Sequence, residues 1–257
     1  MKLPKISQSL IKGLFDYLHN EECGLLFKAK YVDKTYMSEP SAAMKLGIYF
    51  EYLCTGMLPK SGIVPQPERT IKGQLTEAYQ RVIQSAALFK KTIAYYKIKV
   101  LSVGLYLDTN EADGLLDILA EWNGKVVIID LKFSGLLDDK WNELGWETKS
   151  LATKDSIMIQ GVHYKMLVKD VLEKDVDFFY FVFNSADADD MKIIKQVVDE
   201  DKIAAHRVVI SEVKQRLSET IKNGFIARPA YRKCRKCPLF DTCKSRAEFP
   251  TIEEVQY

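Results

Sequence analysis

The spacing of apolar residues predicts five helices. In each of them, apolar side chains recur every three or four positions, which places them on one face of a helix. The predicted helices span residues 6–19, 40–54, 75–96, 156–172 and 200–222. Gly56 and Pro59 are expected to end the second helix. The stretch 58–74 carries three prolines and two glycines and predicts a loop, and a further loop is expected around Trp141 and Trp146.

Four apolar runs predict strands, at residues 97–107, 114–122, 125–133 and 176–184. Asn123-Gly124 separates the second run from the third, which is the strongest short-range signal for a hairpin with a type I′ turn. Both of these runs are apolar on both faces, so the hairpin is expected to lie centrally in a sheet covered by helices on each side. The order of elements indicates a mixed α/β domain. The chain has no glycine-rich phosphate loop, which argues against a doubly wound nucleotide fold.

The composition is that of a globular protein, with 257 residues, 47% hydrophobic and 28% charged. We expect one domain over residues 1–257. Residues 1–20 lack the continuous apolar core of a signal peptide, and the longest apolar runs, 126–129 and 178–183, are too short to span a bilayer. The sequence therefore predicts a cytoplasmic protein with no membrane partner.

The net charge of +2 conceals a segregation of charge along the chain. Residues 60–99 carry eight Lys or Arg against two acids, and residues 228–246 carry seven against one. Residues 170–201 instead hold ten acids against three lysines. The basic segments could contact several phosphates, which would make binding to nucleic acid sensitive to salt. The alternative is that they are solvated helix faces.

Two aspartates are expected to face each other across the predicted hairpin. A two-residue turn at Asn123-Gly124 places Asp117 directly opposite Asp130, and Lys132 shares their face because strand side chains alternate. Like charges in this arrangement destabilise the fold, and a Mg²⁺ or Mn²⁺ ion bound by both carboxylates would compensate for their repulsion. The alternative is that one aspartate is protonated, or that a bulge turns both toward solvent.

These residues resemble a known family. Gly114-x-x-Asp117 followed by Asp130-Leu-Lys132 is similar to the core motif of the PD-(D/E)xK nucleases, and Gln160-x-x-x-Tyr164 is similar to a motif of their RecB-like branch. The resemblance implies an α/β, restriction-endonuclease-like domain with a central mixed sheet flanked by helices. It implies that Glu51, Asp117 and Asp130 bind the metal. The implied catalytic set is Glu51, Asp117, Asp130, Lys132, Gln160 and Tyr164.

The match to the family pattern has departures. Leu116 stands where the family has proline, Asp130 stands where many members have glutamate, and Glu51 replaces a common histidine. Asp113 shares the face of Asp117 and is a rival for the first carboxylate. Gly47 lies one helical turn before Glu51 and is expected to permit a close approach of helix and sheet.

The five cysteines call for an explanation other than disulfides in a cytosolic protein. Cys234, Cys237 and Cys243 follow a C-x2-C-x5-C spacing, which suggests a metal or cluster lacking one ligand. Cys54 lies on an apolar helix flank, where a buried thiol is the default, and Cys23 lies in a loop. A zinc ion is the alternative occupant. Similarity to iron–sulfur RecB-like nucleases, such as the AddB nuclease domain and CRISPR-associated exonucleases, implies a [4Fe-4S] cluster bound by Cys23, Cys234, Cys237 and Cys243 that joins the two ends of the domain.

The leading hypothesis is a metal-dependent DNA nuclease, an exonuclease acting on single-stranded DNA or DNA ends. One alternative is a non-catalytic iron–sulfur DNA-binding subunit of a recombination, repair or CRISPR-adaptation complex. Another is a cluster or zinc protein unrelated to nucleic acid. The sequence leaves open a homo-oligomer or a protein partner of a recombination complex. His19, His163 and His206 are interpreted as ordinary polar residues.

Overall fold

The fold is given by a computed structural model. It describes residues 3–19, 22–36, 39–59, 61–135, 137 and 151–250, and for residues 151–158 it describes the backbone alone. The chain divides into two compact units. We call residues 40–207 the central unit, and residues 1–39 with 208–257 the terminal unit. The single-domain organisation expected over 1–257 stays a prediction. The loop expected around Trp141 and Trp146 lies outside the described residues.

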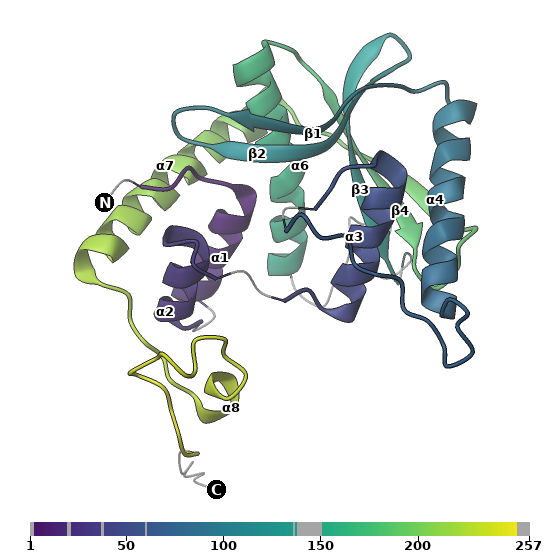
Figure 1. Cartoon of the computed structure of the whole chain (residues 1–257). Helices are drawn as coiled ribbons and strands as arrows, with labels where there is room; N and C mark the ends of the chain where they lie inside the picture. Colours follow the sequence, from purple (N-terminus) through teal and green to yellow (C-terminus); the bar gives the residue numbers. More distant parts are fainter. Residues whose placement is uncertain are drawn as a thin grey trace, which may run out of the picture. The chain divides into compact units, whose positions relative to one another are not determined.

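The central unit contains a five-stranded mixed sheet whose strand order follows the chain (Figure 1). The third and fourth strands pair in parallel, and the other neighbours are antiparallel. This confirms the expected mixed α/β architecture, except that the short last strand was not predicted, because two adjacent isoleucines break its alternation. The strands are β1 (Lys99–Asp108), β2 (Asp113–Trp122), β3 (Lys125–Ser134), β4 (Asp177–Asn184) and β5 (Met191–Gln196).

The hairpin between β2 and β3 has the predicted turn. Asn123 has φ of 51° and Gly124 has φ of 74°, the left-handed values that a type I′ turn requires at both positions. Helix α6 (Leu151–Leu172) lies in the connection between the parallel strands β3 and β4, which need a long crossover. It begins five residues earlier than the expected helix. The crossover therefore brings α6 onto one face of the hairpin.

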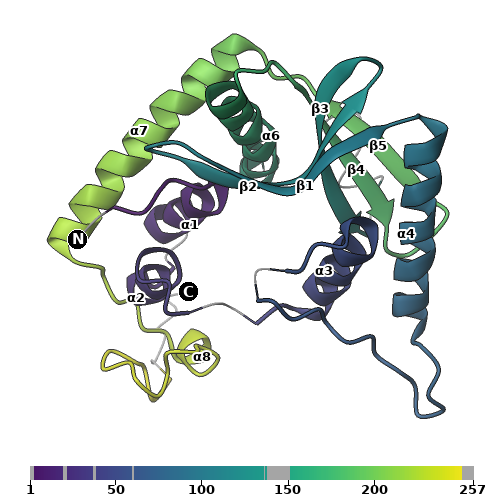
Figure 2. The ribbon, with the colours of Figure 1, turned by 45° about the horizontal axis from the view of Figure 1, so that its top comes forward.

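Helices cover both faces of the sheet, as predicted. Helices α3 (Ala42–Thr55) and α4 (Glu77–Tyr95) lie on one side and α6 on the other (Figure 2). Helix α3 begins where Ser41 Oγ accepts a hydrogen bond from the Met44 N–H, at 3.3 Å. It ends at Gly56, whose φ of 73° forms a left-handed C-cap. The predicted limits of this helix are confirmed.

Aromatic packing holds α3 against the sheet. The ring of Phe50 lies 5.2 Å from that of Phe133 and 4.9 Å from that of Phe183, and all three belong to the core on this face. Burying one such ring contributes about 1.5–3 kcal/mol. Because Glu51 follows Phe50 directly, this packing also sets the position of Glu51.

The terminal unit brings the two ends of the chain together. Gly24 N–H donates to the Ile226 carbonyl at 2.9 Å, and Ile226 N–H donates to the Tyr17 hydroxyl at 3.2 Å. A side chain on Gly24 would place its Cβ 2.6 Å from the Ile226 carbonyl oxygen, so this contact requires glycine. No described helix has the length and apolar character needed to cross a membrane. The unit contains α1 (Gln8–His19), α2 (Gly24–Phe27), the π-helix η1 (Lys28–Val32), α8 (Tyr231–Cys234) and, from residue 208 on, α7 (Glu200–Asn223).

Candidate active site and cysteine cavity

The strand register places the two predicted aspartates together. The register expected from the turn is the observed one, and its last pair is Ile118 with Ile129. Asp117 and Asp130 occupy the next position along each strand. There the Asp117 Oδ2 accepts a hydrogen bond from the Leu131 N–H at 2.8 Å, so the Asp117 side chain bridges to the backbone of β3. The alternative in which a bulge turns both carboxylates toward solvent is wrong, because Asp130 is 1% exposed.

Asp130 is held by neighbours from two elements. Gln160 Nε2, on α6, donates to Asp130 Oδ1 at 2.5 Å. Lys132, two residues further along β3, forms an ion pair with Asp130 Oδ2, and its Nζ lies 5.7 Å from the centre of the Tyr180 ring. The hydrogen bond at Oδ1 and the ion pair at Oδ2 fix the orientation of the carboxylate. The structure therefore joins the predicted Asp-x-Lys pair to the predicted glutamine.

The electrostatics connect Glu51 and Tyr164 to this cluster. Burial, together with the nearby carboxylates of Asp130 and Glu51, raises the pKa of Asp117 well above its ordinary value. Burial and then Asp130 likewise raise the pKa of Glu51. Burial, with smaller effects of Asp130 and Asp117, raises the pKa of Tyr164. For Lys132, burial acts to lower the pKa, but the three carboxylates outweigh it and raise the pKa, so the ammonium stays protonated.

The chemistry of these donors suits a hard divalent cation. Across the described ranges, no three His, Cys, Asp or Glu side chains already converge as a site for a single metal ion. The carboxylates nevertheless raise one another's pKa, and a cation between them would relieve this repulsion with the oxygen ligands that Mg²⁺ and Mn²⁺ prefer. Lys132 now provides part of this compensation at Asp130 Oδ2, so a cation would compete with the ammonium for that oxygen.

Asp113 has other partners. Its Oδ2 accepts a hydrogen bond from the Tyr106 hydroxyl at 2.9 Å, and its backbone carbonyl accepts one from His163 at 2.9 Å. Burial, and then this hydrogen bond to Asp113, raises the pKa of Tyr106 to about 12. Of the two rivals for the first carboxylate, Asp117 is the one that reaches the strand of Asp130.

The close approach of helix and sheet occurs at a different glycine from the one expected. A Cβ on Gly47 would meet no described atom within 4 Å, so the role expected for Gly47 beside Glu51 is wrong. A Cβ on Gly114 would instead lie 2.8 Å from Leu167 and 2.9 Å from Tyr164. The missing side chain at Gly114 thus allows α6 to lie directly on β2. The glycine in the Gly-x-x-Asp motif was the available signal.

Two histidines are not the ordinary polar residues that the sequence suggested. His163 and His206 are 0% and 5% exposed, and His163 Nδ1 lies 3.0 Å from His206 Nε2. They are 43 residues apart in the sequence, on α6 and α7, so no local pattern could pair them. His19, in contrast, is exposed.

Four of the five cysteines line one cavity in the terminal unit. The cavity has a volume of about 570 Å³. Burial raises the pKa of Cys237, and the other three cysteines of the cavity raise it further. The Ala247 N–H donates to Cys234 Sγ at 3.4 Å. Cys54 belongs to the central unit, where burial raises its pKa. The cysteines of the cavity are Cys23, Cys234, Cys237 and Cys243.

The lining of the cavity is basic. Two acidic residues, Asp16 and Glu22, also border it, but the positive side chains outnumber them. A group that carries negative charge would be favoured in such surroundings. The five basic residues are Lys30, Arg228, Lys233, Lys236 and Arg246.

Comparison with known proteins identifies a family for most of the chain. A model of the PD-(D/E)XK nuclease superfamily matches residues 56–244. This stretch includes the predicted site from Asp117 to Tyr164, while Glu51 and Cys23 precede it. No curated protein sequence matches the chain.

One solved structure supports the fold. A crystal structure described as a "Putative exonuclease" from Eubacterium rectale is 18% identical and has a TM-score of 0.62, covering 98% of this chain and 97% of that chain. At this identity the likeness shows a shared fold. A second structure, described as SSO0001, is 12% identical over 93% of this chain and 96% of that chain, and its TM-score of 0.33 carries no argument.

Proposed function

The chain belongs to the PD-(D/E)XK nuclease superfamily, and we propose that it is a metal-dependent deoxyribonuclease, an exonuclease that acts on single-stranded DNA or DNA ends. The observation that carries this proposal is the contact of Asp130 with both Lys132 and Gln160, beside Asp117. Glu51, Asp117 and Asp130 would hold Mg²⁺ or Mn²⁺. When bound, such an ion neutralises charge at the scissile phosphate.

The residues of the chain have separate tasks in this proposal. Lys132 is protonated and brings a positive charge toward the phosphate, where negative charge grows during hydrolysis. Gln160 orients the Asp130 carboxylate through its hydrogen bond. Tyr164 stays neutral, because burial raises its pKa, and can offer a hydroxyl hydrogen bond to the substrate.

The substrate class is supported by the charge of the chain and by one relative. The basic segments 60–99 and 228–246 supply cations for phosphate contacts. The Eubacterium rectale protein of similar fold is described as a "Putative exonuclease". We infer DNA strands or ends as the substrate of this chain.

Digestion of end-labelled DNA tests the activity. The wild type should release mononucleotides or short oligonucleotides from single-stranded or duplex DNA with Mg²⁺ or Mn²⁺, and EDTA should stop the reaction. Lys132→Ala should reduce the rate about 100-fold or more, because it removes a charge-stabilising group. Lys125→Ala, at the exposed start of the same strand, is the matched control. Equal rates for Lys132→Ala and the wild type would overturn the assignment, and binding without cleavage by the wild type would favour the non-catalytic subunit.

A binding measurement tests the metal ligands separately. Mg²⁺ or Mn²⁺ should raise the melting temperature of the wild type, because a ligand that binds only the folded state stabilises it. Asp117→Asn should abolish most of this increase. A cation that stabilises both proteins equally would contradict the proposed ligands.

We further propose that Cys23, Cys234, Cys237 and Cys243 bind a [4Fe-4S] cluster. Support comes from their common cavity, its basic lining and the effect of the other three cysteines on Cys237. Four thiolates and a cluster together carry negative charge, which the surrounding lysines and arginines would balance. The cluster would hold the two ends of the chain together and restrict the unfolded chain.

Anaerobic purification tests this cofactor. The protein should be brown, absorb in the visible range and contain iron, and Cys23→Ser should lose most of that iron. Cys54→Ser is the matched control and should retain it. A colourless protein with one zinc per chain would replace the cluster with the zinc alternative and leave the nuclease proposal standing.

A further inference from the structure

A buried pair of histidines connects three elements of the central unit. His163, on α6, and His206, on α7, meet with their Nδ1 and Nε2 atoms 3.0 Å apart. The other ring nitrogen of His163, Nε2, lies 2.9 Å from the backbone carbonyl of Asp113, the first residue of β2. Both rings are almost completely removed from solvent. The contacts therefore run from α7 through α6 to β2.

The chemistry of the partners sets the direction of these hydrogen bonds. A carbonyl oxygen can only accept, so His163 Nε2 carries the proton and donates to Asp113. In a neutral ring Nδ1 is then an acceptor, and His206 Nε2 must donate to it. Burial, the largest effect at both rings, lowers the pKa of His163 and His206, which keeps the rings neutral and preserves this arrangement. His163, and then Arg207, lower the pKa of His206 further.

The hydrogen bond from His163 to the Asp113 carbonyl joins α6 directly to β2, and the bond from His206 holds the His163 ring. Helix α6 carries Gln160 and Tyr164, and β2 carries Asp117 four residues after Asp113. Close packing at Gly114 brings the surfaces together but gives no directional bond. Hydrogen bonds depend strongly on angle, so the His163 bond to the Asp113 carbonyl resists sliding of the helix along the strand.

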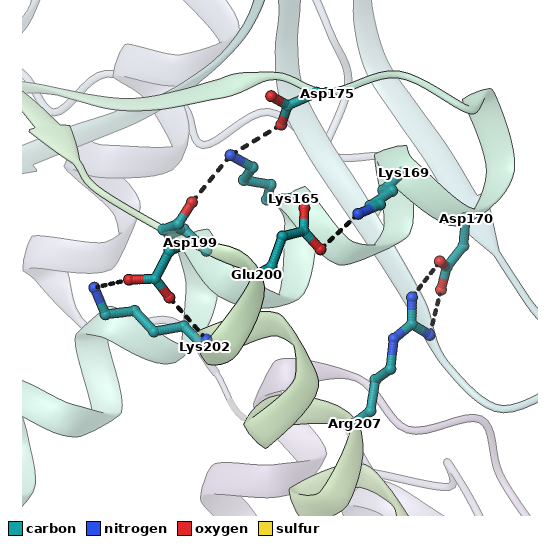
Figure 3. A network of polar contacts seen from close by, with 9 residues as sticks. Lys165, Lys169, Asp170, Asp175, Asp199, Glu200, Lys202 and Arg207 are labelled. Carbon is teal, nitrogen blue, oxygen red and sulfur yellow. Dashed lines mark hydrogen bonds and ion pairs between the residues drawn. The ribbon is translucent and has the colours of Figure 1, made fainter.

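Surface ion pairs also connect α6 with α7 and the segments near it (Figure 3). Lys169 Nζ lies 2.6 Å from Glu200 Oε2, and Arg207 binds both carboxylate oxygens of Asp170 at 2.5 and 2.9 Å. Lys165 donates to the Val198 carbonyl at 3.0 Å. The two ion pairs lie in solvent-accessible positions, where such pairs contribute little. These ion pairs connect α6 only with α7, whereas the hydrogen bonds of the histidine pair also connect α6 with β2.

We propose that His163 and His206 are positioning residues for cleavage: their hydrogen bonds to each other and to the Asp113 carbonyl set α6 so that Gln160 reaches Asp130. This inference rests on the proposed nuclease function and adds two residues that act through Gln160. Neither histidine touches the carboxylate cluster in the described structure. Their effect is transmitted by the placement of a helix.

A double-mutant cycle tests whether the histidines act through Gln160. His206→Leu removes the donor and leaves His163 Nδ1 without its hydrogen bond, which frees the ring to change tautomer and lose Asp113. We expect kcat to fall about fivefold with little change in KM. In a Gln160→Ala background the same substitution should cost less than twofold, because the group it positions is already absent. His206→Gln restores a donor and should return kcat to within about twofold of the wild type.

Arg207→Ala is the matched control at the next residue of α7. It removes the surface pair with Asp170 and should change kcat less than twofold in either background. A fivefold loss for His206→Leu that persists in the Gln160→Ala background, or a loss that His206→Gln fails to rescue, would overturn the proposal. Such results would indicate a general role in stability.

The histidine tautomers provide a readout independent of activity. Nitrogen-15 NMR of the side chains should show both buried rings protonated at Nε2. If the protein shows this pattern but cleaves no DNA, the nuclease proposal is refuted, while the hydrogen bonds assigned to the two histidines still hold. Finding His163 protonated at Nδ1 would refute the positioning proposal, whatever the activity.

Discussion

The carboxylate cluster of the central unit and the cysteine cavity of the terminal unit are built in different ways. In the cluster the functional groups bind one another, as Asp130 binds Gln160 and Lys132. In the terminal unit the Gly24 N–H donates to the Ile226 carbonyl, and four cysteines border an open volume of about 570 Å³. One site is held by contacts among its own side chains, and the other borders an open volume. If the proposed ligands bind, the first site should tolerate the loss of its metal ion better than the second tolerates the loss of its cluster.

The largest expected effect separates activity from stability in the central unit. Asp117→Asn should reduce cleavage about 10³-fold, because a metal ligand contributes several kcal/mol to the transition state. The free energy of unfolding without metal should stay the same or rise, since the substitution removes one of three carboxylates that repel one another. Cleavage kinetics and urea unfolding measure the two quantities. A large loss of stability would show that the cluster is a structural element.

Loss of the proposed cluster should instead lower stability, and it should do so in the terminal unit. In Cys23→Ser, protection from hydrogen exchange at the Gly24 and Ile226 amides should fall about 100-fold, because a cofactor that binds only the folded state contributes directly to folding. The Leu131 amide, which binds Asp117 in the central unit, should keep its protection. Equal losses at all three amides would mean that the two units unfold together.

The buried histidines should make stability depend on pH. An unfolded histidine takes up a proton near pH 6.5, whereas burial lowers the pKa of His206 to about 4. Between these values the unfolded chain binds a proton that the folded chain does not. The free energy of unfolding should therefore fall as pH decreases from about 6.5 to about 4, by roughly 3 kcal/mol.

Urea unfolding across this pH range measures the effect, with His206→Gln as the comparison. The carboxylates with raised pKa favour the folded state as pH falls, so only the difference between the two proteins isolates the histidine. This difference should disappear above about pH 7.

The smallest effect is expected at the surface. Lys169→Ala removes the ion pair with Glu200, whose partners are both exposed. Exposed pairs of this kind contribute about 0–1 kcal/mol and lose strength in salt. Thermal unfolding at low and high salt should show a difference within that range. A loss of several kcal/mol would mean that the surface pairs, and not the histidines, hold α6 in place.

Short-range patterns predicted much of this molecule. The Asn123-Gly124 turn and two apolar runs were sufficient to place Asp117 beside Asp130, because a hairpin needs only local pairing. The end of α3 followed from Gly56, its C-cap. Strand β5 escaped prediction because six residues with two adjacent isoleucines carry little alternation.

Contacts between distant segments could not be predicted from the pattern. His163 and His206 meet only after α6 and α7 have packed, and a single histidine on a helix carries no sign of its partner. The register of the hairpin already favoured Asp117 over Asp113, but the hydrogen bond from the Tyr106 hydroxyl to Asp113 became known only from the fold. The glycine that matters for packing, Gly114, differs from the expected Gly47, because only the fold shows which surface lies beneath each residue.

The two-residue turn between β2 and β3 has a consequence for insertions and deletions. It lies at the far end of the hairpin from Asp117 and Asp130, at the surface, where changes in loop length are ordinarily tolerated. Here the number of residues in the turn decides which residues face each other along both strands. If one residue were added and the turn still kept two residues, Asp130 would shift away from Asp117 and its side chain would turn to the opposite face of the sheet. The length of this turn is therefore as much a part of the site as the carboxylates themselves.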